Sequence, residues 1–277
     1  MRNLILSLAF LVAAPVHAWA QNGWDDPFPA HKVMDNLYFV GTVGLGTFLI
    51  TTPEGHILIN TDFERTIPLI EQNMEGLGFE LADIRIILGS HAHGDHQAAD
   101  VFLRERTGAQ IMIMEEDIAG WQRMMRADRD IPIDRVLRDG EKVTLGGTTL
   151  VAHRTPGHTR GCTSWGMEVE EDGETYNALI VCSFGVNPGY VLIDNPNYPD
   201  IAEDYRATFA KARAMPVDVF VASHGSFYGL GAKYEMLKRR EVSDPNPFID
   251  HAGFLAYVDL KEQQFEAMFE TQRRAVR

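Results

Sequence analysis

The alternation of apolar and polar residues along the chain predicts a succession of short strands and amphipathic helices. Ile84 to Leu88 is apolar at all positions but Arg85 and ends at Gly89, which is typical of a buried strand. Further strands are expected at 37–40, 46–51, 56–60, 110–114 and 217–222, a strand pair at 142–152, and a hairpin with strands at 163–170 and 174–181. Apolar spacings of three and four residues predict helices over 67–77, 97–107, 115–127, 200–214 and 260–274.

The order of these elements indicates the fold class. Strands come early in each half of the chain and helices follow them, and every apolar face must be covered by another element. We therefore expect an α/β fold in which two strand-rich halves pack sheet against sheet, with the helices outside. With 277 residues that are 45% hydrophobic, the chain can bury one large core. No later segment reaches about eighteen consecutive apolar residues, so we expect no transmembrane helix and no membrane anchor.

The formal net charge of −14 narrows the classes of partner. Nucleic acids and anionic lipids bind basic protein surfaces, so the acidic charge argues against both as partners. We expect a monomer that acts on a small molecule.

The first twenty residues have the pattern of a secretory signal peptide. Arg2 is followed by a largely apolar stretch, residues 4–16, and then by Ala18-Trp19-Ala20, a small-x-small cleavage pattern. We expect cleavage after Ala20 (Ala18 is the alternative), a mature domain of residues 21–277 and a periplasmic location. An N-terminal helix buried in the fold is the other interpretation.

Export would place the two cysteines in an oxidising compartment. The predicted turn at 171–173 centres the hairpin so that Cys162 and Cys182 become near cross-strand partners. We expect a disulfide between them. Two buried free thiols are the alternative.

Four potential metal ligands lie within six residues, His91-Ala92-His93-Gly94-Asp95-His96. On an extended segment the alternate residues His91 and His93 leave the same face. Asp95 and His96 follow where the chain turns into a helix, and Gly94 permits the bend between the two pairs. One metal ion cannot easily use all four side chains, whereas two adjacent ions can.

Two further histidines occupy the same kind of position. His158 follows the strand predicted at 149–153, and His224 follows the one at 217–221. Together with the cluster they make five histidines and one aspartate, which suits two zinc ions with three protein ligands each. We expect Asp62, at another strand end, to support the site. The remaining histidines of the mature chain, at positions 31, 56, 153 and 251, lack this context and are interpreted as structural.

These residues, with Gly157-His158-Thr159, resemble the metallo-β-lactamase superfamily over nearly the whole mature chain. The stretches 157–165 and 246–250 resemble the third subclass of class B β-lactamases. The resemblance implies an αββα sandwich, two mixed sheets face to face with helices outside. It assigns His91, His93 and His158 to a first zinc, and Asp95, His96 and His224 to a second. It implies that a hydroxide shared by the two zinc ions, oriented by Asp95, opens the lactam amide of penicillins, cephalosporins and carbapenems.

The residues after the strand at 178–181 discriminate between activities of the superfamily. Di-zinc hydrolases of lactones and thioesters usually have a bridging Asp there, but this chain has Cys182-Ser183, which favours the lactamase. A one-residue shift of the alignment would instead make Cys182 a metal ligand. The family's second hydroxyl residue is replaced by Gly185, so Asn187 or backbone N–H groups are expected to assist Ser183 in binding the substrate carboxylate.

Apolar residues are expected to wall the substrate cleft. Trp24 and Phe28 precede the first strand, and Trp121, Met124 and Met125 lie on a helical stretch. A helical Trp/Met stripe is also typical of core packing. Two other functions stay open: a di-zinc hydrolase of lactones or thioesters, and a zinc-binding member of the family without catalytic activity.

Overall fold

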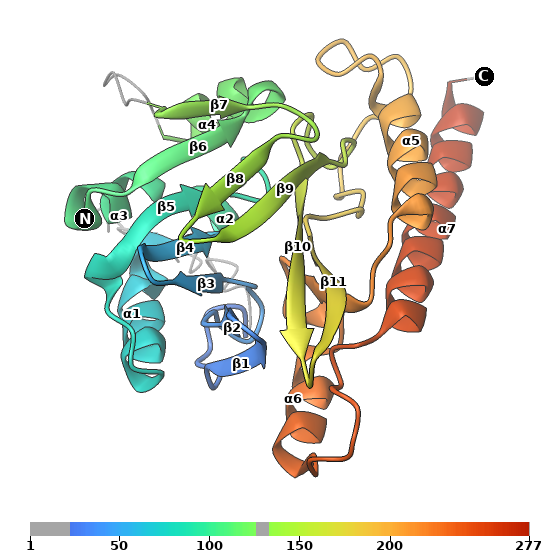
Figure 1. Cartoon of the computed structure of the whole chain (residues 1–277). Helices are drawn as coiled ribbons and strands as arrows, with labels where there is room; N and C mark the ends of the chain where they lie inside the picture. Colours follow the sequence, from blue (N-terminus) through green and yellow to red (C-terminus); the bar gives the residue numbers. More distant parts are fainter. Residues whose placement is uncertain (1–22, 126–132, 277) are drawn as a thin grey trace, which may run out of the picture.

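Two β-sheets packed face to face form the centre of the molecule in the computed structural model (Figure 1), which describes residues 23–125 and 133–276. The predicted signal peptide, residues 1–20, lies outside the described residues. The strands of the first sheet are β1 (His31–Met34), β2 (Leu37–Phe39), β3 (Phe48–Thr52), β4 (Gly55–Ile59), β5 (Ile84–Leu88), β6 (Gln110–Met114) and β7 (Arg135–Leu137). Those of the second are β8 (Lys142–Leu145), β9 (Thr148–Arg154), β10 (Thr163–Glu171), β11 (Glu174–Val181) and β12 (Val219–Ala222).

Both sheets are mixed. The first has the order β1-β2-β3-β4-β5-β6-β7, antiparallel as far as β4 and parallel from β4 to β7. The second has the order β12-β11-β10-β9-β8, in which only the β11–β12 pair is parallel. Parallel pairing places the carboxyl ends of β4, β5 and β6 at one edge, and this is where α/β folds usually place ligand sites.

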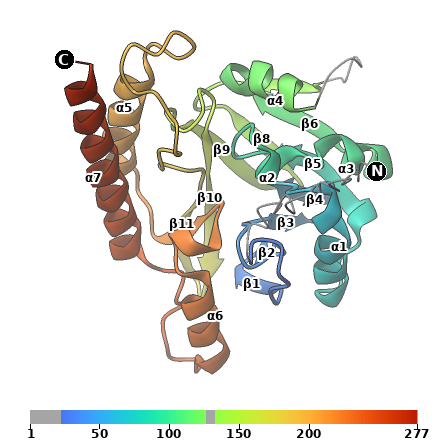
Figure 2. The same cartoon turned by 180° about the vertical axis from the view of Figure 1, so that it is seen from behind.

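Helices cover the two outer faces (Figure 2). The described helices are α1 (Ile67–Gly76), α2 (Gly94–Gln97), α3 (Asp100–Thr107), α4 (Ile118–Met124), α5 (Ile201–Ala214), α6 (Leu230–Arg239) and α7 (His251–Ala275). Helices α1, α3 and α4 pack on the first sheet, whereas α5 and α7 lie side by side on the second. The predicted arrangement of sheets inside and helices outside is therefore confirmed.

The strands of the first sheet are buried on both faces, which explains their continuous apolar runs. In β3, Phe48 and Ile50 point into the core between the sheets, while Leu49 points toward the core under α1 and α3. In β6, Met112 and Met114 face inward and Ile113 faces the helices. Successive side chains of a strand point to opposite faces of the sheet, so each apolar strand contributes residues to both cores.

Several predicted boundaries were wrong. The helix expected over 97–107 is two helices, α2 and α3. Helix α7 begins at His251 instead of residue 260, because the Asp250 side chain accepts a hydrogen bond from Gly253 N at 2.8 Å and caps the helix there. The sequence analysis missed β1, β7 and α6. The first two are short edge strands, for which a hydrophobic run is too brief to be distinctive.

The hairpin prediction is confirmed, together with its register. Trp165 pairs with Ile180 and Glu171 with Glu174, and the strands converge so that Cys162 and Cys182 form a disulfide with Cα atoms 5.9 Å apart. Because its sulfur is in this bond, Cys182 does not supply a thiolate ligand. The bond ties the start of β10 to the end of β11, next to the predicted metal site.

We predict that replacing both cysteines, Cys162→Ala with Cys182→Ala, lowers the free energy of unfolding by about 3 kcal/mol. A closed loop with a sequence separation of 20 residues restricts the unfolded chain by about that amount. Denaturant titration of the oxidised protein and the double variant measures the difference. Equal midpoints would show that the bond contributes nothing.

Candidate functional site

All six predicted ligands converge at the carboxyl edge of the sheets. His91 and His93 lie between β5 and α2, and Asp95 and His96 lie in α2. His158 comes from the loop between β9 and β10, and His224 lies two residues after the end of β12. Three segments far apart in the sequence, at 91–96, 158 and 224, are thus brought together by the packing of one sheet on the other.

Three imidazoles form the first group. The candidate ligand nitrogens of His91, His93 and His158 lie within 4.8 Å of one another. His158 Nδ1 lies 2.6 Å from the Gly185 carbonyl oxygen and donates to it, which leaves its Nε2 free to accept. His91 Nε2 is buried and has no hydrogen-bond partner among the described residues. An orphaned ring nitrogen beside two other imidazoles is what a zinc ion with three histidine ligands requires.

Asp95, His96 and His224 form the second group. The Nε2 atoms of His96 and His224 are 3.2 Å apart, and Asp95 Oδ2 lies 3.3 Å from the first and 3.6 Å from the second. His224 Nδ1 donates to the Gly44 carbonyl oxygen at 3.1 Å, so its Nε2 also presents a lone pair. The Asp95 carboxylate and the two Nε2 atoms thus converge on one point, and they are a donor set of the kind that holds a zinc ion. The group fits a second zinc ion, and His91 lies beside both groups.

Burial keeps these imidazoles neutral. It lowers the pKa of His91 and of His96 well below the usual range, and neighbouring histidines lower both further. Burial, followed by the charge of His93, lowers the pKa of His158 to about 3. Zinc binds the unprotonated ring, so at neutral pH protons offer little competition for these ligands.

Asp117, which the sequence analysis did not select, ties the two loops of the first group together. One carboxylate oxygen accepts from Ala92 N at 2.9 Å and from the Thr159 hydroxyl at 2.8 Å, and the other accepts from Gly161 N at 2.7 Å. Ala92 separates His91 from His93, and Thr159 follows His158. Asp117 therefore sets the spacing of all three ligands through their backbone, and its position among acidic residues 115–117 gave no sequence signal for this role.

The loop before His158 depends on close approach to an aromatic ring. Gly157 has a positive φ of 124°, and a Cβ there would lie 2.6 Å from the Tyr205 ring. The Tyr205 hydroxyl donates to the Gly185 carbonyl at 2.8 Å, the same oxygen that receives the His158 proton. Tyr190 donates to the His158 carbonyl at 2.8 Å. These contacts orient the imidazole from both sides.

Asp62 lies beneath the second group and is fully buried. Burial raises the pKa of its carboxyl group to about 8, with smaller effects from Thr47 and Asp95. Its backbone N–H is directed at the His96 carbonyl, and its own carbonyl accepts from Ala99 N at 3.2 Å. These contacts support the expectation that Asp62 holds the segment carrying Asp95 and His96.

A cavity of about 770 Å³ opens above the ligands. Trp24, Ser183 and Asn187 line it, as expected for substrate contacts, and so do several residues that the sequence analysis missed: Phe63, Ser226, Phe227, Lys261 and Gln264. Trp24 packs on His224 with ring centroids 5.0 Å apart, because Gly44 leaves room for its indole. Ser183 is almost fully buried, so its hydroxyl is reached only from the cavity.

The other expected wall residues lie elsewhere. Trp121 is fully buried in the core and donates from Nε1 to Asp100 Oδ2 at 2.7 Å, so the core interpretation of that stripe was right. Met124 and Met125 pack against the same core. Phe28 packs edge-on against Phe39 and is not among the described residues that line the cavity.

The four histidines interpreted as structural stay outside the cluster. His31, for example, stacks on Phe39 and Phe248, and His251 Nδ1 donates to the Val217 carbonyl at 2.7 Å. Packing and backbone hydrogen bonds thus hold these two rings away from the candidate ligands.

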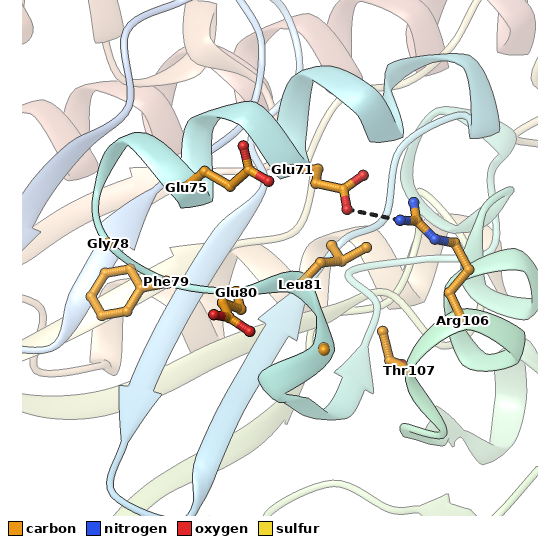
Figure 3. A pocket seen from close by; sticks show the side chains of 9 residues that line it. Glu71, Glu75, Gly78, Phe79, Glu80, Leu81, Arg106 and Thr107 are labelled. Carbon is orange, nitrogen blue, oxygen red and sulfur yellow. Dashed lines mark hydrogen bonds and ion pairs between the residues drawn. The ribbon is translucent and has the colours of Figure 1, made fainter.

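A second hollow, of about 470 Å³, lies between the end of α1 and the end of α3 (Figure 3). Glu71, Glu75 and Glu80 line it, and Arg106 pairs with Glu71 at 2.7 Å. No histidine or cysteine is among its described lining residues. It therefore offers no chemistry comparable to that of the histidine site.

Comparison with known proteins agrees with this geometry. A family model for the metallo-β-lactamase superfamily matches residues 47–224, and the chain belongs to that superfamily. The native FEZ-1 metallo-β-lactamase from Legionella gormanii is 42% identical, with 90% of this chain and 98% of that chain covered and a TM-score of 0.84. BJP-1, a subclass B3 metallo-β-lactamase of Bradyrhizobium japonicum, is 37% identical, with 93% and 100% covered and a TM-score of 0.85. The αββα fold and the resemblance to the third subclass are thereby confirmed.

Matches to curated relatives are more local. Hydroxyacylglutathione hydrolase of Fuscovulum blasticum is 34% identical over 84 residues, 30% of this chain and 28% of that protein. A probable metallo-hydrolase of Burkholderia pseudomallei is 32% identical over 94 residues, 30% of this chain and 31% of that protein. The chain thus aligns with about a third of the length of these relatives.

We predict that Asp117→Asn weakens zinc binding by about 10- to 100-fold, the usual effect of removing a carboxylate that orients metal ligands. The asparagine amide has one acceptor oxygen. It can accept either from Ala92 N and the Thr159 hydroxyl or from Gly161 N, but not from all three. Competition with a chromophoric chelator measures the affinity. Asp83→Asn, at a half-exposed side chain just before β5, is the control, and equal affinities for both variants would contradict the role of Asp117.

We predict that the metal-free protein loses stability as the pH falls from about 7 to about 5. The unfolded chain protonates its histidines near 6.5, whereas the folded chain keeps His91, His96 and His158 neutral, the last down to about pH 3. The unfolded state then binds more protons, so the free energy of unfolding falls through this window. Burial raises the pKa values of Asp62 and Asp100 to about 8 and about 7, so these two groups stabilise the folded state as the pH falls.

The histidines with lowered pKa values outnumber the carboxyl groups with raised ones, so the histidine effect dominates. Calorimetry in the presence of a chelator follows the melting temperature across this range. A melting temperature that rises toward pH 5 would refute the sign.

Proposed function

We propose that the protein is a di-zinc β-lactamase that hydrolyses the lactam amide of penicillins, cephalosporins and carbapenems. The observation that carries this proposal is the pair of adjacent three-ligand groups at the base of the cavity, with Ser183 beside them. The similarity to β-lactamases over nine-tenths of the chain supports the same activity.

The residues around the cavity have different roles in the proposed reaction. Zinc bound at the two groups would supply Lewis-acid polarisation of the lactam carbonyl and activation of a water nucleophile. Asp95 presents its carboxylate between His96 and His224, where it accepts a hydrogen bond from the attacking water and orients it. Trp24 covers His224 at the mouth and limits the access of bulk water.

Position 183 favours the lactamase over the other hydrolases of the superfamily. Thioesterases and lactonases that resemble this fold have a carboxylate between the two metals, whereas here the strand β11 ends in Cys182, which is disulfide-bonded, and Ser183. The local match to hydroxyacylglutathione hydrolase, over 84 residues, keeps thioester hydrolysis as the alternative function. The complete ligand set argues against a member that only binds zinc.

The mature enzyme is proposed to be a periplasmic monomer of residues 21–277. The disulfide is consistent with an oxidising compartment. No helix in the described ranges is long and apolar enough to cross a membrane.

Substrate profiling with metal analysis tests the function. We expect two zinc ions per chain and turnover of a penicillin, a cephalosporin and a carbapenem that a chelator abolishes and zinc restores. Efficient cleavage of an acyl-homoserine lactone or of S-lactoylglutathione, without cleavage of any lactam, would replace this proposal with the alternative.

We predict that Asp95→Ala retains one zinc ion and loses about 10²- to 10⁴-fold in kcat, the range found for groups that position a transferred proton. The variant removes one ligand of the second group and leaves the first group complete. Metal analysis and steady-state kinetics measure both effects, with Asp83→Ala as the matched control. Two bound zinc ions and a full rate would show that Asp95 is not a ligand.

A further inference from the structure

One lysine interrupts the buried side of the C-terminal helix. On α7 the buried residues Phe254, Tyr257, Val258 and Phe265 follow the spacing of three and four residues that faces the core. Lys261 comes four residues after Tyr257 and four before Phe265, so it belongs to the same stripe. Its side chain is directed inward, where an apolar residue would be expected.

Lys261 has no carboxylate partner among the described residues. Its Nζ lies 5.0 Å from the centroid of the Phe227 ring and 5.6 Å from that of Tyr257, and its contact with Gln264 Oε1 is 3.4 Å long. Burial lowers the pKa of this ammonium group. In a chain with 39 acidic residues, a partly desolvated cation without a carboxylate needs an explanation.

Lys233 shows how the same fold treats a structural lysine. Its Nζ also lies among aromatic rings, 5.2 Å from the Phe220 centroid and 5.8 Å from that of Tyr228. It has a counter-ion of its own, Asp250, at 2.9 Å. Both ammonium groups lie beside aromatic rings, but Lys233 is buried whereas Lys261 is half-buried, and Lys261 lacks the anion.

The place of that anion is in the active-site cavity. Lys261 lines the same cavity as Asp95, His158 and His224. A Cβ at Gly185 would lie 3.7 Å from Ser183 Oγ and 3.9 Å from Lys261 Nζ, so the hydroxyl and the ammonium group flank one small space left open by the glycine. A cation and a hydroxyl donor converging on one space form a carboxylate-binding site.

We propose that Lys261 binds the substrate carboxylate, the group carried by the ring carbon next to the lactam nitrogen, together with the Ser183 hydroxyl. This assignment rests on lactam hydrolysis at the histidine site. The net charge of −14 repels an anionic substrate, and a local cation overcomes that repulsion where the lactam must lie. Lys261 is thus a specificity-determining residue for substrates that carry a free carboxylate.

The test compares Lys261→Met with the wild-type enzyme on a cephalosporin and on its methyl ester, which lacks the negative charge. We expect KM for the acid to rise about 10- to 100-fold, the value of one charge-assisted hydrogen bond. We expect kcat to stay within about 2-fold, because ground state and transition state lose the same contact. KM for the ester should not change. Lys261→Arg should retain most of the affinity for the acid.

Lys238→Met, on the exposed side of α6, is the matched control and should leave KM for the acid and for the ester unchanged. Zinc content and circular dichroism verify that each variant is folded and loaded, and Lys261→Gln provides the same comparison should the methionine variant not fold. An unchanged KM for the acid, or an equal rise for acid and ester, would overturn the assignment while leaving lactam hydrolysis intact. A wild-type enzyme that cleaves neither substrate would overturn both.

Discussion

The structure depends on holding six candidate metal ligands, five of them imidazoles, close together in one largely buried place. A neutral imidazole has one N–H donor and one acceptor nitrogen, and His96 and His224 satisfy each other in part, with their Nε2 atoms 3.2 Å apart. The cluster nevertheless leaves His91 Nε2 and His96 Nδ1 buried without a hydrogen-bond partner among the described residues, which costs free energy. The surrounding fold holds these side chains together, and a bound cation would accept the lone pairs of the ring nitrogens that lack a partner.

That constraint is met by hydrogen bonds that reach the ligands through their backbone or their second ring nitrogen. Asp117 fixes the segments of His91, His93 and His158, and carbonyl oxygens of Gly185 and Gly44 receive the Nδ1 protons of His158 and His224. Each of these partners comes from a different loop. The rigid sandwich below positions the loops, which explains why the ligands can be so distant in sequence and still meet within hydrogen-bonding distances.

The cavity adds selectivity to this chemistry through positions that are not ligands. Gly185 provides space instead of a side chain, and the disulfide ties the end of β11 to the start of β10. Lys233 has Asp250 as a counter-ion, whereas Lys261 has no carboxylate partner among the described residues and leaves a positive charge in the wall of the cavity. The same fold can therefore favour an anionic lactam through two or three residues.

Much of this protein could be read from local patterns in the chain. The strands at 84–88 and 110–114, the hairpin with its disulfide, and the six residues that converge as candidate ligands were predictable, because each depends on residues close together in sequence or on a recurrent motif at strand ends. Trp121 and Phe28 were considered as cavity walls and lie in packed regions, since an apolar residue looks the same in sequence whether it faces a cavity or a core. Asp117 and Lys261 gave no usable signal by themselves. Their roles arise from contacts across the sandwich, from an acidic turn to two metal-binding loops and from the last helix to the cavity, and only tertiary packing brings those partners together.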